Sequence, residues 1–276
     1  MNPDAGTDVA TDLRDLALLV ARDAVALARR MRDGGIAVAD TKSSVVDVVT
    51  AADRACEELI RSRILAARPD DAIMGEEGED HPGTSGVRWI VDPIDGTVNY
   101  LYGLPDWAVS IAAEVDGAVV AGVVVNGSSG AEYAAARGAG ATCDGRPIAV
   151  RPSPPLAERL VLTGFGYRSD VRAHQAACVA ALLPHVRDIR RMGSCALDLC
   201  HIADGSGDAY VEEGPNPWDH SAGGLVLTEA GGRFGLLPGR LREIVPEAAV
   251  EALVVGAPAD GWDTFVAALG RAGFLA

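Results

Sequence analysis

The sequence predicts an α/β protein in which helices cover the faces of a sheet. Three observations support this fold class. In the second half, short apolar runs alternate with helical patterns, which is typical of a layered sheet with helices on its faces. Aromatic residues make up only 5% of the chain, and Ala, Val, Leu and Gly take their place, which favours α/β over an aromatic-rich all-β fold. At 276 residues, the chain can bury a substantial core, as one large domain or as two lobes.

The first half begins with helices and continues with strands. Apolar residues at helical spacing predict an amphipathic helix over about 9–32. A second helix over about 51–67 stops before Arg68-Pro69, because a residue before proline disfavours the helical conformation. Asp116-Gly117 predicts a hairpin turn between two strands. Short apolar runs predict the strands of this half, at about 72–74, 89–91, 108–115, 118–125 and 131–136.

A proline-rich stretch at 152–155 separates the two halves. We therefore expect an N-terminal α+β lobe over residues 1–151 and a C-terminal α/β lobe over residues 152–276. The second lobe is expected to contain strands at about 160–163, 186–190, 209–211 and 252–256. Its helices are expected at about 172–183, 195–203, 222–230 and 262–272.

Charge and cysteine usage limit the partners of the protein. The formal net charge of −15 would repel a polyanion, so we expect no nucleic acid partner. An enzyme that acts on small anions must then neutralise its own site, and bound divalent cations would do so. The five cysteines are odd in number and form no CxxC pair, which indicates free thiols in a reducing compartment. The polar N-terminus is no signal peptide, and the longest apolar run is too short for a bilayer. We expect a cytoplasmic protein without a membrane partner.

Several carboxylates lie where expected strands and helices begin or end. The apolar run 89–91 leads into Asp92 and Asp95, which are three residues apart in a turn that also contains Pro93 and Gly96. Such residues are also common in ordinary turns, so an acidic turn without chemistry is the alternative. A further apolar run ends at Glu76-Glu77, and Asp219 lies at the start of an expected helix.

Taken together, these carboxylates predict a site for a hard metal ion. Three separate strand or helix ends supply them, and no paired His or Cys accompanies them. Carboxylate oxygens suit Mg²⁺, which keeps several waters and binds substrate phosphate directly, whereas zinc and copper prefer other ligands. The residues that could hold the metal are Glu76, Asp92, Asp95 and Asp219.

The order of these motifs resembles the inositol monophosphatase family. The matching segments are Gly75-Glu76-Glu77, Asp92-Pro93-Ile94-Asp95-Gly96-Thr97, Trp218-Asp219-His220-Ser221-Ala222-Gly223 and the spaced residues from Lys42 to Asp53. The similarity extends from about residue 8 to residue 270 and is specific for the sugar-phosphatase superfamily. It implies a layered αβαβα sandwich and a Mg²⁺-dependent phosphatase of small phosphorylated polyols. It also implies a homodimer and inhibition by lithium.

The resemblance also implies a role for individual residues. The first metal would be held by Glu76, Asp92 and the carbonyl of Ile94, and the second by Asp92, Asp95 and Asp219. Gly96 and Thr97 would donate to the phosphate, Asp53 and Thr97 would orient the attacking water, Glu77 would support the site, and Lys42 would belong to a mobile catalytic loop. Substrate hydroxyls would contact Asp95, Gly193, Ser194, Cys195, Glu212 and Asp219. Tyr167 stands where some relatives carry a small hydroxyl residue, so it could close the pocket differently.

Several alternatives remain open from the sequence. Glu212 could be a solvated strand end, and Lys42 could be an ordinary surface lysine. The leading substrate is an inositol monophosphate, but sister enzymes use histidinol phosphate, fructose 1,6-bisphosphate or adenosine 3′,5′-bisphosphate. Arg190 or Arg191 could face the pocket and favour a second phosphate. Some bacterial relatives bind transcription or translation machinery, so a non-catalytic interaction protein is a further alternative. The complete carboxylate set favours catalysis.

Overall fold

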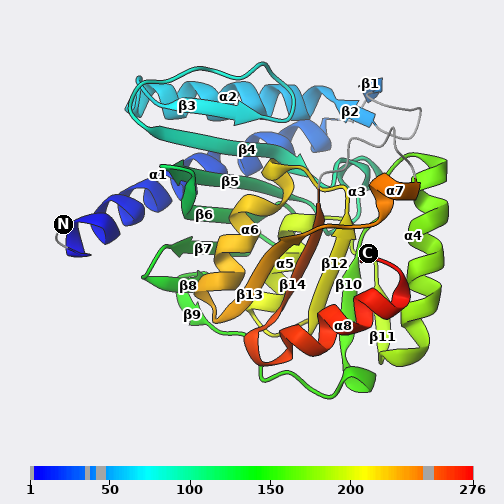
Figure 1. Ribbon diagram of the computed structural model, residues 1–276. Coiled ribbons are helices and arrows are strands. Elements are labelled where there is room, and N and C mark those ends of the chain that lie inside the picture. Colours follow the sequence, from blue (N-terminus) through cyan, green and yellow to red (C-terminus); the bar gives the residue numbers. More distant parts are fainter. Residues whose placement is uncertain (1–2, 35–37, 42–47, 245–251, 276) are drawn as a thin grey trace.

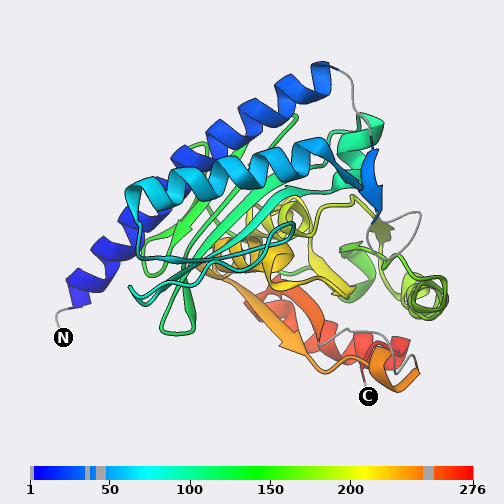
Figure 2. The same cartoon turned by 90° about the horizontal axis from the view of Figure 1, so that it is seen from above.

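The computed structural model describes residues 3–34, 38–41, 48–244 and 252–275. Helices and sheets alternate in five layers (Figures 1 and 2), which confirms the predicted αβαβα sandwich. Seen from above, α1 and α2 lie side by side over the first sheet (Figure 2). In order, the layers are α1 (Pro3–Asp33) with α2 (Ala51–Ala67), a seven-stranded sheet, α5 (Cys195–Ala203) with α6 (Pro217–Glu229), a five-stranded sheet, and α4 (Ser169–Leu182) with α8 (Trp262–Ala272).

The seven-stranded sheet places its strands in sequence order. Only the first pair, β3 and β4, is parallel, and every other neighbouring pair is antiparallel. Trp89 and Ile111 on one face pack against α1 and α2. The strands are β3 (Ala72–Gly75), β4 (Val87–Asp95), β5 (Ala108–Val115), β6 (Ala118–Asn126), β7 (Glu132–Ala136), β8 (Gly140–Cys143) and β9 (Arg146–Ile148).

The five-stranded sheet has the order β11-β10-β12-β14-β13, with both parallel and antiparallel pairs. Its outer face packs on α4 and α8 through Val161, Leu182 and Phe265. Its strands are β10 (Leu160–Thr163), β11 (Asp188–Arg190), β12 (Ala209–Glu213), β13 (Gly232–Leu237) and β14 (Leu253–Pro258). The remaining elements are the two-stranded sheet β1 (Val38–Thr41) with β2 (Val48–Thr50), the short helices α3 (Thr97–Tyr102) and α7 (Leu241–Ile244), and 3₁₀ turns at Leu156–Glu158, Leu183–His185 and Ala259–Gly261.

The middle helices α5 and α6 belong to one core with both sheets. Ala222 and Val226 of α6 share a cluster of buried residues with Val124 of the first sheet and Val254 of the second. Small residues permit this close packing, because a Cβ on Gly122 of β6 would lie 2.8 Å from the Ala222 carbonyl oxygen. The helices are therefore enclosed on both sides, and the sheets are held at a fixed separation.

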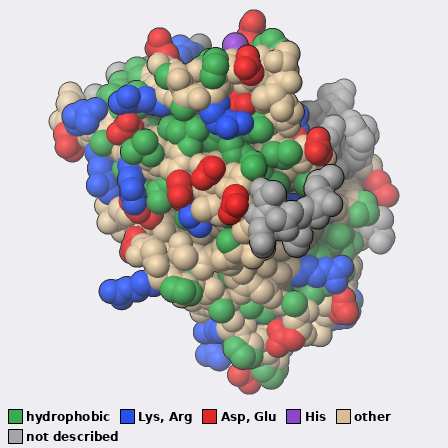
Figure 3. Space-filling view, turned by 90° about the vertical axis from the view of Figure 1, so that its left-hand side faces the viewer, with side chains coloured by type: hydrophobic (Ala, Val, Ile, Leu, Met, Phe, Trp, Pro, Cys, Tyr) green, Lys and Arg blue, Asp and Glu red, His purple; other side chains and the backbone are tan. Residues whose placement is uncertain are grey.

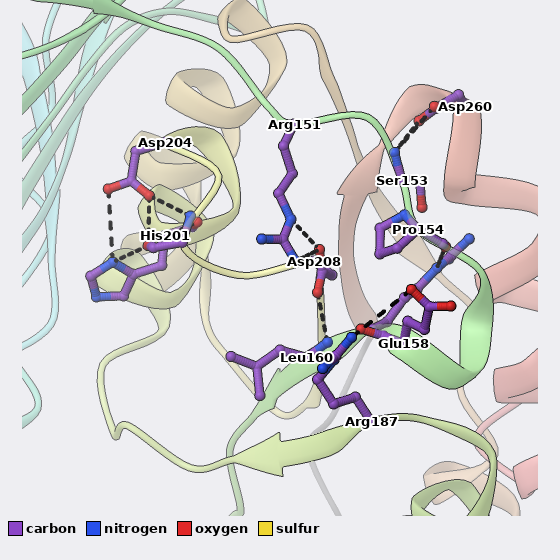
Figure 4. A network of polar contacts seen from close by, with 12 residues as sticks. Arg151, Ser153, Pro154, Glu158, Leu160, Arg187, His201, Asp204, Asp208 and Asp260 are labelled. Atoms are coloured by element: carbon purple, nitrogen blue, oxygen red, sulfur yellow. Dashed lines mark hydrogen bonds and ion pairs between the residues drawn. The ribbon is translucent and has the colours of Figure 1, made fainter.

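The connection between the sheets is fixed to the C-terminal half (Figure 4). Arg151 donates a hydrogen bond of 2.6 Å to Asp208, and the other oxygen of Asp208 accepts one of 2.7 Å from the Leu160 amide. The Ser153 amide donates to Asp260 at 3.2 Å. The sheets separate near the predicted lobe boundary at 151/152, while α5 and α6 contact both of them. The division into two lobes stays a prediction.

Most predicted elements are present, and the differences have local causes. Helices α2, α5 and α8 have the predicted bounds, whereas α6 begins at Pro217, five residues earlier than predicted. Its early start follows from a capping box in which the Asp219 carboxylate accepts a hydrogen bond from the Asn216 amide. The strands that the sequence did not predict are glycine-containing or very short: β8, β9, β13 and the β1–β2 pair.

Glu213 is a buried acid at the end of β12 that affects the pH dependence of stability. It is 1% exposed, and its carboxylate lies 3.4 Å from Nε2 of His174 on α4. Burial raises the pKa of Glu213 from 4.5 to about 7 and lowers the pKa of His174. Between pH 4.5 and about 7, Glu213 therefore holds a proton in the folded protein that it has released in the unfolded chain. The free energy of unfolding contributed by Glu213 therefore falls as the pH rises from 4.5 through 7.

Glu213→Gln is expected to raise the free energy of unfolding at pH 8 by about 1–2 kcal/mol, because the variant buries no charge there. The gain should shrink towards pH 5, where the folded wild type already carries the proton. Urea unfolding at both pH values measures the difference, with Glu79→Gln as the exposed control. A variant that is no more stable than the wild type at pH 8 would contradict the prediction.

Candidate active site

Two carboxylates face the same way at the end of β4, although they are three residues apart. In a regular strand, positions of opposite parity point to opposite faces. Here the pairing of β4 with β5 shifts register between Asp92 and Asp95, and such an irregularity re-aims a side chain. The turn is closed by the Ile94 amide, which donates to Oδ1 of Asp92 at 3.0 Å. Gly96 follows with φ of 91°, a conformation that favours glycine.

A third carboxylate completes a cluster from the other half of the chain. Asp219 lies in the first turn of α6, and one oxygen each from Asp92, Asp95 and Asp219 lies within 4.8 Å of the others. Burial raises the pKa of Asp92 and Asp219 well above 3.8, and the negative charge of Glu76 raises both further. The cluster therefore has an unfavourable concentration of negative charge, which a bound divalent cation would neutralise.

Asp95 is anchored to the middle layer of the sandwich. Its Oδ2 accepts hydrogen bonds from the Ser194 hydroxyl at 2.5 Å and from the Ala196 amide at 2.8 Å. The second bond satisfies one of the free amides at the N-terminus of α5, where a negative charge is favourable. Burial raises the pKa of Asp95 to about 6, and these hydrogen bonds oppose the rise. The side chain thus fixes the end of β4 against α5.

Asp53 and Thr97, to which the family resemblance assigns the attacking water, are joined by a hydrogen bond. Oδ1 of Asp53 on α2 accepts a hydrogen bond of 3.1 Å from the Thr97 hydroxyl, which also lies 3.1 Å from the Ile94 carbonyl oxygen. Oδ2 of Asp53 accepts from the amide and hydroxyl of Thr50, at 2.8 and 2.5 Å. Because the Asp53 side chain is fully buried and held at both oxygens, it fixes the orientation of the Thr97 hydroxyl.

Asp92, Asp95 and Asp219 line a pocket of about 410 Å³ between the ends of the two sheets. It contains eleven of the predicted site residues, which are Glu76, Asp92, Ile94, Asp95, Gly96, Thr97, Tyr167, Gly193, Cys195, Glu212 and Asp219. The acids Glu76, Asp92, Asp95 and Asp219 come from β4, α6 and the loop after β3, and the second half contributes the facing wall. One site is therefore built from both halves of the chain.

Glu212 provides a carboxylate on the facing wall and is not a solvated strand end. Its Oε2 accepts a hydrogen bond of 2.5 Å from the Tyr210 hydroxyl, and it lies against Gly164, where a Cβ would be only 2.0 Å from that oxygen. Arg191 also lines the pocket, and its positive charge lowers the pKa of Glu212 against the larger effect of burial. Arg190 instead pairs with Asp188 at 2.5 Å on the surface.

Of the described residues that were predicted for the site, Asp53, Glu77 and Ser194 do not line the pocket. Ser194 is 1% exposed and bonds to Asp95, so its hydroxyl faces a carboxylate. Glu77 lies on the far side of its loop, beside Glu57 of α2, and its amide bonds to that residue at 2.7 Å. Lys42 lies outside the described residues. His220 is buried beside Phe234 and its pKa is lowered to about 4, which agrees with a structural role.

Asn99 is a site residue that the sequence did not reveal. Its side-chain amide is buried and donates to two carbonyl oxygens, that of Asp106 at 2.6 Å and that of Met192 at 2.8 Å. It thereby joins the turn after β4 to the loop that contains Gly193. The only sequence signal is its position two residues after Thr97, on a helix too short to show a period.

Comparison with known proteins agrees with this geometry. A model described as the inositol monophosphatase family matches residues 8–268. The chain belongs to the inositol monophosphatase family. Inositol-1-monophosphatase SuhB of Mycobacterium tuberculosis is 43% identical, over 94% of this chain and 93% of that protein. Nus factor SuhB of Xylella fastidiosa is 42% identical, over 69% and 70%. The solved structure of Mycobacterium tuberculosis SuhB matches with a TM-score of 0.81 at 40% identity, over 96% of this chain and 98% of that one.

Membership of the inositol monophosphatase family makes the protein a metal-dependent phosphatase of small phosphorylated substrates. The buried carboxylate cluster suits that chemistry, because it brings three oxygen ligands close together. All five cysteines are free, as predicted. Among the described residues, no helix is long and apolar enough to cross a membrane.

Proposed function

We propose that the protein hydrolyses phosphate monoesters of polyols in the presence of Mg²⁺, and that a myo-inositol monophosphate is its preferred substrate. The observation that carries the proposal is the pairing of two features in one pocket. The carboxylate cluster of Asp92, Asp95 and Asp219 lies on one side, and the Glu212 carboxylate lies on the other. The first would hold metal and phosphate, and the second would accept hydrogen bonds from substrate hydroxyls.

The donor set fits magnesium better than a softer metal. Proposed ligands are the carboxylates of Glu76, Asp92, Asp95 and Asp219 and the carbonyl of Ile94, all of which offer oxygen. When bound, Mg²⁺ would supply positive charge to the phosphate and make a bound water more acidic. The Cys195 thiol also lines the pocket, but burial raises its pKa well above 9.0, so it stays protonated and is a poor ligand.

The residues beside the cluster would position the attacking water and the phosphate. The Thr97 hydroxyl donates a hydrogen bond to the buried Asp53 carboxylate, so the lone pairs of the hydroxyl oxygen can accept a hydrogen bond from a water. Gly96 lines the pocket at the start of α3, and glycine is needed there because a Cβ would lie 2.8 Å from the Asp106 carbonyl oxygen. Positioning and charge neutralisation account for most catalysis of phosphoryl transfer, so no covalent nucleophile is required.

The charges of the facing wall favour a neutral polyol over a second phosphate. Arg191 is balanced by Glu212 and by the buried Asp198, since its charge acts on the pKa of both. Arg168, the other arginine of the pocket, pairs with Asp170 at 2.7 Å. Tyr167 is 40% exposed at the rim and would contact the polyol. Each arginine would have to give up an acidic partner before it could bind an additional phosphate.

Phosphate release with Mg²⁺ from inositol 1-phosphate, histidinol phosphate, fructose 1,6-bisphosphate and adenosine 3′,5′-bisphosphate tests the proposal. We expect kcat/KM for inositol 1-phosphate to exceed the others by about tenfold or more, and all activity to disappear with EDTA. Preference for another ester would leave the proposed metal chemistry standing but contradict the substrate assignment. Activity that survives EDTA would contradict the proposed metal requirement. We also propose that lithium inhibits the protein, so phosphate release in the same assay should fall as LiCl is added.

We further propose a cytoplasmic homodimer that binds no nucleic acid. The free thiols support the location, and the net charge of −15 supports the absence of a nucleic acid partner. On the face shown in Figure 3, basic side chains are interspersed with acidic ones. A non-catalytic role is the second candidate, because the similar protein of Xylella fastidiosa is named a Nus factor. The complete carboxylate cluster supports catalysis, and absence of phosphate release from every ester would favour the second candidate.

A further inference from the structure

Glu57 is a buried acid that the proposed chemistry does not use. It lies on α2, one turn after Asp53, and its side chain is 3% exposed. Its Oε2 accepts a hydrogen bond of 2.7 Å from the Glu77 amide, and its Oε1 accepts one of 2.9 Å from the Gly78 amide. The carboxylate thus holds two consecutive amides of the loop that follows β3. Hydrogen bonds of this kind, from amides to a charged acceptor, are stronger than those between neutral groups.

The glycines of this loop are explained by the same carboxylate. A Cβ on Gly75 would lie 2.5 Å from Oε1 of Glu57, and a Cβ on Gly78 would lie 2.8 Å from it. Both positions therefore need glycine because the acid occupies the space beside them. The sequence Gly75-Glu76-Glu77-Gly78 is shaped around Glu57 as much as around the pocket.

Glu76 is fixed on both sides by these contacts. Before it, Gly75 pairs with Val91 as the last residue of β3. After it, the Glu77 amide is held by Glu57. The side chain of Glu76 lines the active-site pocket, whereas Glu57 lies behind the loop. Glu57 can therefore determine where the Glu76 carboxylate points without touching the metal or the substrate.

We propose that Glu57 is a positioning residue that sets the affinity of the active site for Mg²⁺ by orienting Glu76. The inference rests on the proposed function, in which Glu76 is a metal ligand. In this proposal, α2 positions two site residues, because its Asp53 orients Thr97 and its Glu57 orients Glu76. Residues that hold metal ligands in place commonly change metal affinity by 10–100-fold when they are replaced.

A purely structural role is the competing explanation, because Glu57 also accepts a hydrogen bond of 2.8 Å from Arg61. Glu57→Gln distinguishes the two. The amide keeps the volume of the acid and one acceptor oxygen, but its NH₂ group cannot accept from the second amide. The loop then loses one of its two anchors. Glu58→Gln is the matched control, since Glu58 is the adjacent, exposed acid on the same helix.

The test measures metal binding with the metal alone. Mn²⁺ binding is followed by electron paramagnetic resonance without substrate, and the rise in Tm is recorded against Mg²⁺ concentration. Glu57→Gln should weaken Mn²⁺ binding about tenfold and shift the Mg²⁺ dependence of Tm equally. Its kcat at saturating Mg²⁺ should stay within about threefold of the wild type, because the metal, once bound, restores the site. Glu58→Gln should behave as the wild type.

The outcomes distinguish failure of the proposed function from failure of the inference. If the wild type binds no Mn²⁺, or if Asp92→Asn binds it equally well, the proposed function fails and the inference fails with it. If the wild type binds and Glu57→Gln binds with the same affinity, the inference alone is overturned. Should Glu57→Gln not fold, Gly78→Ala takes its place, because its Cβ would displace the loop from an intact Glu57. Unchanged Mn²⁺ affinity in a folded Gly78→Ala would then overturn the inference.

Discussion

Asp95→Asn is expected to lower kcat about 1000-fold while leaving the protein folded. Asparagine keeps an oxygen that can accept from the Ser194 hydroxyl and the Ala196 amide, so the contact between β4 and α5 is retained. It removes the charge that would hold a cation with Asp92 and Asp219, and it turns an NH₂ group towards the cluster. Loss of a single preorganised electrostatic group commonly costs 10²–10³ in rate, and the loss of a proposed metal ligand lies at the upper end.

Phosphate release at saturating Mg²⁺ and inositol 1-phosphate measures the effect. Circular dichroism and Tm in EDTA show that the fold is intact. The metal-free variant should be at least as stable as the wild type, because the pKa of Asp95 is raised to about 6 by burial and the variant has no charge to bury. Asp116→Asn is the control, since Asn tolerates the positive φ of that hairpin residue. A near-native rate in Asp95→Asn would show that the metal assignment is wrong.

The residues of the carboxylate cluster could be predicted because each stands in a local pattern. Asp92 and Asp95 follow an apolar run, and Asp219 begins a helix, so sequence position alone marks them. Their convergence could not be derived from spacing. It depends on a register shift in the pairing with β5 and on the placement of α6 between two sheets. The family resemblance supplied that information.

Glu57 and Asn99 were not recognised because their partners are distant in the sequence. The Glu57 carboxylate holds amides twenty and twenty-one residues away, and Asn99 binds the Met192 carbonyl ninety-three residues away. A carboxylate on the inner side of a helix was nevertheless a usable signal. Asp53 and Glu57 are four residues apart on α2 and share a face with Ile60, so burying them required partners.

The layer order also lay beyond the periodicity of the sequence. A helix with one apolar face indicates which side meets a sheet. Helices α5 and α6 are buried on nearly all sides between two sheets, and their small residues give no single apolar stripe. Sequence periodicity could therefore predict α5 and most of α6 but not their central position. The same enclosure makes them suitable to carry Cys195 and Asp219 into the pocket from fixed backbones.

Thr97→Val is expected to lower kcat about 100-fold with little change in KM. Valine matches the shape of threonine but lacks the hydroxyl that donates to Asp53 and that would accept from the attacking water. Proton transfer and water positioning by one side chain are commonly worth 10²–10⁴ in rate. Asp53→Asn should give a loss of similar size, because the amide no longer fixes the direction of the Thr97 hydroxyl.

The double variant decides whether these two residues act as one unit. If Asp53 works only through Thr97, Thr97→Val with Asp53→Asn should be no slower than the slower single variant, since neither partner has a separate function to lose. Steady-state kinetics at saturating Mg²⁺ measures the coupling. Thr142→Val, which removes a hydroxyl from β8 far from the pocket, is the matched control. If the loss in kcat of the double variant equals the product of the two single losses, Asp53 and Thr97 contribute independently. The prediction that they orient the water as one unit would then be wrong.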